Sequence, residues 1–354
     1  MATENCVLVR LLAHLSFSNM PLKLPVRLLD VSLMKVEMYR DIQDDVRKEG
    51  YICISHVWGD MKEYSASKLG IKGGVDWKIP LSDPKKLERI RKAVLHQKKK
   101  YCWLDLVCIP QGDDRLDERI VEIPHMGSYY EGATMTLVMA TYRHPAPAII
   151  RKPVGVIMGA LYGTTSMSLK VANMSYRLTD LGMEEEEWFK RVWTFQEAIF
   201  SKSLKYVTYS GRHHDLTDIL DKITDMSEGK PGDIDDILEH NHELDRLSYA
   251  IREYYKGKTD LVEVMSKACW RNRTKDHDVV YGVMAVLGYA TLPVRYDITL
   301  EELNEAVVRY AYSQGDISWL SVGGNTGKGF IQPVCQTFTR VGKYWKSVNL
   351  EQSL

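Results

Sequence analysis

Three short apolar runs alternate with helical segments in the first half of the chain, and this alternation most constrains the fold. The runs cover residues 51–58, 101–109 and 134–140. Their length and their β-branched and aromatic content predict buried strands. Between them, residues 81–100 and 118–133 show helical spacing, and the second helix is interrupted near Pro124. Strands that alternate with helices in this way predict an α/β fold with a parallel sheet.

The remaining patterns extend the sheet and add a helical part. Residues 26–39 alternate as in an edge strand or hairpin, 184–203 return to helix, and 204–211 form another short strand. Residues 141–183 lack a clear period and are expected to insert over the sheet, whereas helical spacing dominates from about residue 215 onward. We therefore predict a leader at 1–25, an α/β domain at 26–212 and a mostly α-helical region at 213–354 packed on it.

The charge balance argues against nucleic acid or a membrane as the main partner. The 354-residue chain has 47 Lys and Arg against 47 Asp and Glu, so its formal net charge is zero. Its longest uncharged run, 279–294, is too short and contains too much Gly and Tyr to span a bilayer. Because the N-terminal segment lacks the basic start of a secretory signal, we expect a cytoplasmic protein.

The cysteines predict neither disulfides nor a metal site. None of the 6 forms a C-x-x-C pair, and they are scattered along the chain. In a reducing compartment, such residues behave as small buried apolar side chains. We expect no bound metal.

Three sequence blocks combine polar and aromatic residues: SHVWGD (55–60), WLDLVCIPQ (103–111) and RVWTFQE (191–197). The first two blocks follow or end predicted strands, and ligands of open α/β sheets bind at the carboxyl ends of the strands. In the third block, Trp193 and Glu197 lie one helical turn apart on the same face. The candidate substrate-binding residues are Trp58, Asp60, Trp103, Gln111, Arg191, Trp193 and Gln196.

Glu197 is the first candidate for chemistry. An indole beside a carboxyl excludes water and raises the pKa of the acid, which suits a general acid or base. The structural alternative pairs Glu197 with Arg191 or Lys190, or with backbone amides, and the sequence does not separate the two.

Asp105 and His56 are the other catalytic candidates, and each has a structural alternative. Asp105, placed in the middle of a predicted strand, would act as a buried hydrogen-bond hub. His56 would be a satisfied polar residue at a strand end. Trp58 and Trp103 would be core aromatic residues.

The blocks, taken together and in order, resemble the fungal heterokaryon-incompatibility (HET) domain family. The resemblance covers roughly residues 26–211, and the segment 273–289 resembles one that follows the domain in many such proteins. The departures are mild: Ile54, Leu104 and Pro110 stand where Leu, Ile and Asp are usual.

The resemblance implies a fold similar to Toll/interleukin-receptor (TIR) domains, with a flavodoxin-like parallel sheet between helices. TIR domains that cleave NAD use a Glu four residues after a Trp, and Trp193 and Glu197 have this spacing. The resemblance therefore implies NAD as a candidate substrate and no further cofactor. Glu197 would stabilise developing oxocarbenium charge or orient the ribose, and Trp58 or Trp193 would stack on a ring.

Three functions remain open on the sequence. The first is a self/nonself-recognition or cell-death module that consumes NAD and engages a protein partner or a second copy of itself. The second is a stand-alone enzyme of secondary metabolism that cyclises or isomerises a small apolar substrate by acid catalysis. The third is a non-catalytic interaction domain.

Overall fold

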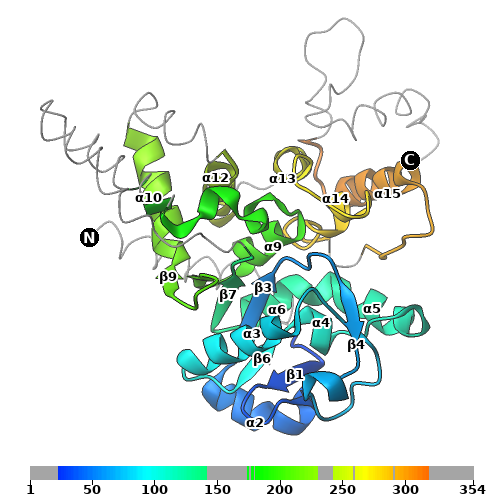
Figure 1. Ribbon diagram of the computed structural model, residues 1–354. Helices are drawn as coiled ribbons and strands as arrows, with labels where there is room; N and C mark the ends of the chain where they lie inside the picture. Colours follow the sequence, from blue (N-terminus) through cyan, green and yellow to red (C-terminus); the bar gives the residue numbers. More distant parts are fainter. Residues whose placement is uncertain are drawn as a thin grey trace, which may run out of the picture.

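A seven-stranded sheet organises the first half of the chain (Figure 1). The computed structural model describes residues 23–141, 174, 177–178, 180–229, 242–257, 260–289 and 292–318. Most of the predicted leader (1–25) and most of the expected insertion at 141–183 lie outside these ranges. In spatial order the strands are β2 (Lys35–Met38), β1 (Arg27–Asp30), β6 (Tyr101–Trp103), β3 (Ile52–His56), β7 (Met135–Met139), β8 (Leu204–Val207) and β9 (His213–Asp215).

The central strands of this sheet are parallel and its edges are antiparallel. β3 pairs in parallel with β6 and β7, and β7 pairs in parallel with β8. At the edges, β1 and β2 form the hairpin expected within 26–39, and β9 returns beside β8. The α/β fold is confirmed, but the sheet is mixed, since β1 pairs antiparallel with β6 as well as with β2. Short turns, which permit only antiparallel pairing, join β1 to β2 and β8 to β9.

Helices connect the parallel strands across both faces of the sheet. α3 (Pro84–His96) leads from β3 to β6, whereas α5 (Leu116–Glu122) and α6 (Met126–Gly132) lead back from β6 to β7. Because the two crossovers run in opposite directions, their right-handedness places α3 and α6 on opposite faces. The Asp83 carboxylate caps α3 by accepting a hydrogen bond from the Lys85 N–H at 3.0 Å.

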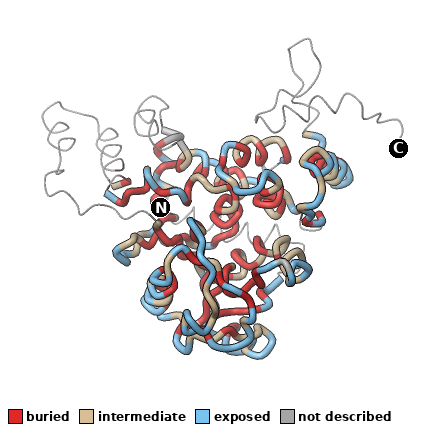
Figure 2. The backbone as a smooth tube through the Cα atoms, turned by 45° about the vertical axis from the view of Figure 1, so that its right-hand side comes forward, coloured by how far each residue is buried: buried red, intermediate tan, exposed pale blue. Residues whose placement is uncertain are grey.

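Aromatic side chains fill the core between the sheet and α6. Trp103 is fully buried, and its ring meets those of Tyr129 and Tyr130 edge-on, with centroids 5.4 and 5.6 Å apart. Figure 2 shows the buried residues running through the centre of both the sheet part and the helices above it. Trp103 therefore packs in the core.

The prediction of a strand over 101–109 was wrong beyond Trp103. The chain turns into the short helix α4 (Asp105–Cys108), so Asp105 lies at a helix start instead of mid-strand. The Asp105 carboxylate accepts the Leu106 N–H at 2.7 Å, a local bond that competes with strand pairing. Its side chain thereby reaches the carboxyl-terminal edge of the sheet.

The helix predicted over 184–203 begins only at Trp193, where α9 (Trp193–Phe200) starts. Residues 183–190 form two 3-10 turns, and Arg191 is extended. The Arg271 guanidinium donates to the carbonyls of Phe189 and Arg191 at 2.8 and 3.2 Å. These side-chain bonds occupy carbonyls that a continuous helix would have used for its own N–H groups.

The later helices lie against the carboxyl-terminal edge of the sheet (Figure 1). They are α10 (Leu216–Gly229), α12 (His242–Tyr255), α13 (Leu261–Ala268), α14 (Asp278–Tyr281) and α15 (Leu300–Ser313). Within the described ranges, no helix has the length and apolar character that crossing a bilayer requires.

At Gly127, α6 packs closely against α9 and the later helical segment. A Cβ at this position would lie 2.8 Å from Ala285 Cβ and 2.9 Å from Phe200 Cε2. We expect Gly127→Val to lower the free energy of unfolding by about 1–3 kcal/mol through overpacking. Denaturant titration checks this, with Gly74→Val as the control, because a Cβ at Gly74 has no neighbour within 4 Å. Equal losses in both variants would contradict the close packing.

Candidate active site

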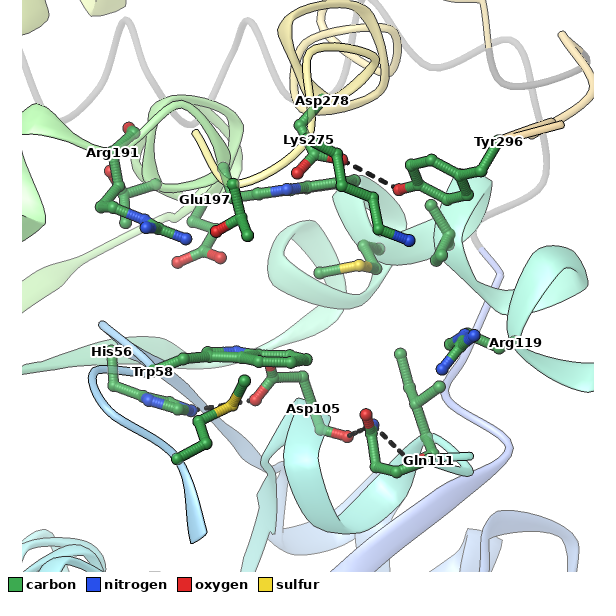
Figure 3. Close-up of a pocket in the computed structure, with 17 residues that line it drawn as sticks. His56, Trp58, Asp105, Gln111, Arg119, Arg191, Glu197, Lys275, Asp278 and Tyr296 are labelled. Carbon is green, nitrogen blue, oxygen red and sulfur yellow. Dashed lines mark hydrogen bonds and ion pairs between the residues drawn. The ribbon is translucent and has the colours of Figure 1, made fainter. Parts of the chain in front are cut away.

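A cleft of about 320 Å³ opens where β3 and α4 meet the segment 274–296. Figure 3 shows its floor built from the sheet part and its opposite wall from α9 and the later helices. This position at the carboxyl ends of β3 and β6 is where open α/β sheets bind ligands. The predicted site residues that line the cleft are His56, Trp58, Asp105, Gln111, Arg191, Trp193 and Glu197.

Asp105 ties the floor of the cleft together. Its Oδ1 accepts hydrogen bonds from His56 Nε2 at 2.9 Å and from the Leu106 N–H, and its Oδ2 accepts the Trp58 indole N–H at 2.7 Å. The His56 side chain is 1% exposed and that of Asp105 17% exposed. These bonds hold the Trp58 ring across the floor (Figure 3). Asp105 therefore has the geometry of a hub that presents an aromatic platform.

The protonation states of this cluster follow from burial and contacts. Burial lowers the pKa of His56, and the nearby Lys86 lowers it further, so we assign a neutral imidazole that donates from Nε2. Burial alone would raise the pKa of Asp105, but His56, Trp58 and the Leu106 N–H lower it below its usual value. Asp105 is thus a carboxylate at neutral pH.

Lys86 holds the backbone beside this cluster by a hydrogen bond. Its ammonium group donates to the Val57 carbonyl at 2.5 Å, and burial lowers its pKa to about 8. A side chain of α3 thereby fixes the chain between His56 and Trp58.

Glu197 lies across the cleft on α9, and its protonation state is opposite to that of Asp105. Only 6% of the residue is exposed, and its Oε2 accepts the Ser55 hydroxyl. Burial raises the pKa of Glu197 to about 8 despite the hydrogen bond from Ser55, which lowers it, while the Asp105 charge raises it. Glu197 is therefore mostly protonated at neutral pH.

The partners that we expected for a structural Glu197 do not hold its carboxyl. Lys190 instead pairs with Glu187 at 3.4 Å, and Arg191 lowers the pKa of Glu197 only through its charge. The carboxyl faces the cleft, as Figure 3 shows. A buried carboxyl that opens onto a cavity without an ion pair is available to a ligand.

Cationic and aromatic side chains line the rest of the cleft. Arg191, Arg119 and Lys275 extend toward its interior (Figure 3). Trp58 and Trp193 supply indole rings, and both are half-buried. This combination suits a ligand with both a planar ring and negative charge.

Three predicted binding residues lie elsewhere. Trp103 points into the core, and Gln196 is 1% exposed on the buried side of α9. Asp60 is exposed in the turn after β3 and does not line the cleft. Gln196 precedes the lining residue Glu197 by one position, and this step around the helix turns it away from the cleft. Trp103 lies two residues before Asp105 and packs against Tyr129 and Tyr130.

The sequence did not identify the wall contributed by the later segment. Asp278 accepts the Tyr296 hydroxyl at 2.9 Å, and Lys275 Nζ lies 4.1 Å from the centre of the Tyr296 ring. Arg119, from α5, was also missed. Lys275 and Asp278 fall inside the block 273–289 that we had noted, and this block was the available signal.

The described part of the chain has no group of three or more His, Cys, Asp or Glu side chains that could hold a metal ion. The cysteines that it contains in β3, β6 and α4 are buried free thiols with raised pKa values, principally from burial: Cys53, Cys102 and Cys108. Their burial leaves them without access to the cleft.

The fold and cleft together define an α/β protein with a carboxyl-containing site at the sheet edge. Residues 51–197 match the model of the family described as Heterokaryon incompatibility protein (HET). These residues thus form a HET domain, as the sequence blocks indicated. No curated protein and no solved structure matches the chain. Lys275, Asp278 and Tyr296 lie beyond the matched residues.

The hub role of Asp105 predicts a pH-dependent loss of stability on its removal. We expect Asp105→Ala to lower the free energy of unfolding by about 1–3 kcal/mol, because His56 and Trp58 lose their acceptor. Since the folded-state pKa of Asp105 is lowered, this stabilisation is complete above about pH 4 and is lost as the pH falls further.

Denaturant titrations at several pH values measure this effect. Asp60→Ala is the matched control, because Asp60 is exposed and its removal should change stability by less than about 0.5 kcal/mol. An Asp105→Ala deficit that grows toward low pH would contradict the assigned ionisation.

Proposed function

We propose that this HET-domain protein is a signalling module of the heterokaryon-incompatibility type that acts by cleaving the glycosidic bond of a nicotinamide dinucleotide. The observation that carries the proposal is Glu197, a buried carboxyl facing a cleft that also contains indole rings and cationic side chains. The likeness to TIR domains that the sequence blocks imply supports it as an analogy of fold, together with the spacing of Trp193 and Glu197.

The cleft offers complementary groups for each part of such a substrate. Trp58, held flat by Asp105, would stack on a base. Arg119, Arg191 and Lys275 would pair with the diphosphate. The cations favour this substrate over a wholly apolar one, which would desolvate their charges and offer them no anionic group.

Glu197 would act on the cationic centre of the reaction. When the bond between the ribose and nicotinamide breaks, its electron pair goes to the ring nitrogen and the ribosyl carbon becomes cationic. An ionised Glu197 stabilises that cation, and water then adds to the carbon and releases a proton. Because the pKa of free Glu197 is about 8, the positively charged substrate ring must displace its proton.

A second function is favoured by that same protonation state. A neutral carboxyl in a half-apolar cleft is suited to donate a proton, as an acid-catalysed cyclase or isomerase requires. The two proposals demand opposite forms of Glu197, so the pH dependence of the reaction separates them.

Glu197→Gln is expected to reduce nicotinamide release from NAD by at least about 100-fold. In the parent protein, kcat/KM should rise with pH and level off above about 8, since it reports the free enzyme and requires ionised Glu197. Chromatographic measurement of nicotinamide between pH 6 and 9, corrected for uncatalysed loss, checks both.

Each other result has a definite meaning. A kcat/KM that falls as pH rises through about 8 would favour acid catalysis by neutral Glu197. Equal turnover by Glu197→Gln would remove this residue from the reaction. Absence of turnover by both proteins would favour the non-catalytic interaction domain.

Lys275→Met tests the proposed diphosphate contact. We expect ADP to bind about 10-fold more weakly, since a charge-assisted hydrogen bond contributes about 1.5 kcal/mol or more. Binding of adenosine, which lacks phosphate, should not change. Calorimetric titration measures both ligands, with Lys48→Met as the control because Lys48 is exposed on α2 (Tyr39–Glu49), outside the cleft. Equal weakening of adenosine binding would contradict a phosphate contact.

A further inference from the structure

Behind the cleft, a chain of buried hydrogen bonds ends on Glu197. The Trp188 indole N–H donates to Ser55 Oγ at 2.5 Å, and the Ser55 hydroxyl donates to Glu197 Oε2. Trp188 and Ser55 are both 0% exposed. Trp188 belongs to a 3-10 turn and Ser55 to β3. The series of hydrogen bonds therefore runs from this turn to the sheet and from the sheet to α9.

The Trp188 indole sets the donor-to-acceptor direction of these hydrogen bonds. An indole N–H can only donate, so it occupies an acceptor site of the Ser55 oxygen. The single Ser55 hydrogen is then left to point at Glu197. Ser55 could accept from both Trp188 and a protonated Glu197 only by turning its hydrogen away from Glu197, where the described part of the structure offers that hydrogen no other acceptor.

This direction has a consequence for neutral Glu197. Oε2 already receives the Ser55 hydrogen, and the carbonyl oxygen of a neutral carboxyl is a better acceptor than its hydroxyl oxygen. The proton is therefore favoured on the other oxygen, Oε1, while Oε2 remains the carbonyl oxygen. The arrangement thus distinguishes two oxygens that are equivalent in a free carboxyl.

We propose that Trp188 and Ser55 are positioning residues that fix which oxygen of Glu197 carries its proton. This inference gains its catalytic meaning from the proposed function, but the hydrogen-bond direction does not depend on the substrate. It makes Oε1 the oxygen that gives up a proton when a cationic ligand enters, and Oε2 the oxygen held by the protein.

Other charged or titratable groups act on Glu197 and are left in place by the test. Tyr130 on α6 donates a hydrogen bond that lowers the pKa of Glu197, and Arg191 lowers it through its charge. Asp105 on α4 raises it, and Cys53 on β3 interacts electrostatically with it.

The test is Ser55→Ala, with the Glu197 carboxyl followed directly by carbon-13 NMR as a function of pH. Ser55 donates to both forms of Glu197 but more strongly to the ionised one, so removing its hydroxyl should raise the pKa of Glu197 by about 1. Trp188→Phe should raise it less, since Ser55 remains able to donate to the ionised form. Should Trp188→Phe fail to fold, Ser55→Ala alone decides.

Ser201→Ala is the matched control. Ser201 is a buried serine one turn along α9 that donates to the main-chain carbonyl of Glu197 at 2.5 Å and not to its carboxyl. We expect this variant to leave the Glu197 pKa unchanged. A Ser55→Ala shift no larger than that of Ser201→Ala would overturn the proposal.

Infrared spectra test whether Ser55 donates its hydrogen bond to the carbonyl oxygen of neutral Glu197. In the parent protein at pH 6, the carbonyl oxygen of neutral Glu197 accepts the Ser55 hydroxyl, so Ser55→Ala should move its C=O stretch to higher frequency. An unmoved band would overturn the proposal. Both measurements need no substrate, so they can succeed although NAD is not cleaved, and they can fail although NAD is cleaved.

Discussion

The Asp105 carboxylate is the contact on which the site depends, because it joins three segments that the fold brings to one edge of the sheet. It accepts from His56 at the end of β3, from Trp58 beyond that strand and from the first N–H after itself in α4. A carboxylate with several donors stays ionised when it is buried. Without it, the indole of Trp58 would have no fixed orientation, and the cleft would have no flat floor.

The wall of the cleft that contains Glu197 depends on a second buried charged side chain, Arg271. Arg271 is 2% exposed, and its guanidinium holds the carbonyls of Phe189 and Arg191. It thus stops a helix from forming before Trp193 and sets where α9 begins. Since Glu197 follows one turn later, a side chain from the loop between α13 and α14 helps to place a carboxyl of the HET domain at the cleft. The matched domain and the segment after it therefore form one site.

Periodicity was sufficient to predict the α/β alternation and the hairpin at the edge, because strands and amphipathic helices bury their faces at different spacings. It failed at Asp105, where a single side-chain bond ends a strand that its apolar neighbours would have continued. It also failed before Trp193, where the competing donor is Arg271, 80 residues away from Arg191. Local patterns contain no information about such distant partners, and the same limit hid Lys275 and Tyr296 as lining residues.

Asp105 and Glu197 show that burial alone does not set the state of an acid. Both are removed from water, which by itself raises the pKa of each. Asp105 gains His56, Trp58 and a backbone N–H, and these outweigh burial. Glu197 has hydrogen bonds from Ser55 and Tyr130, feels the negative charge of Asp105, and remains mostly neutral. The fixed charge on the floor thus helps to keep the carboxyl on the wall protonated until a positive ligand separates them.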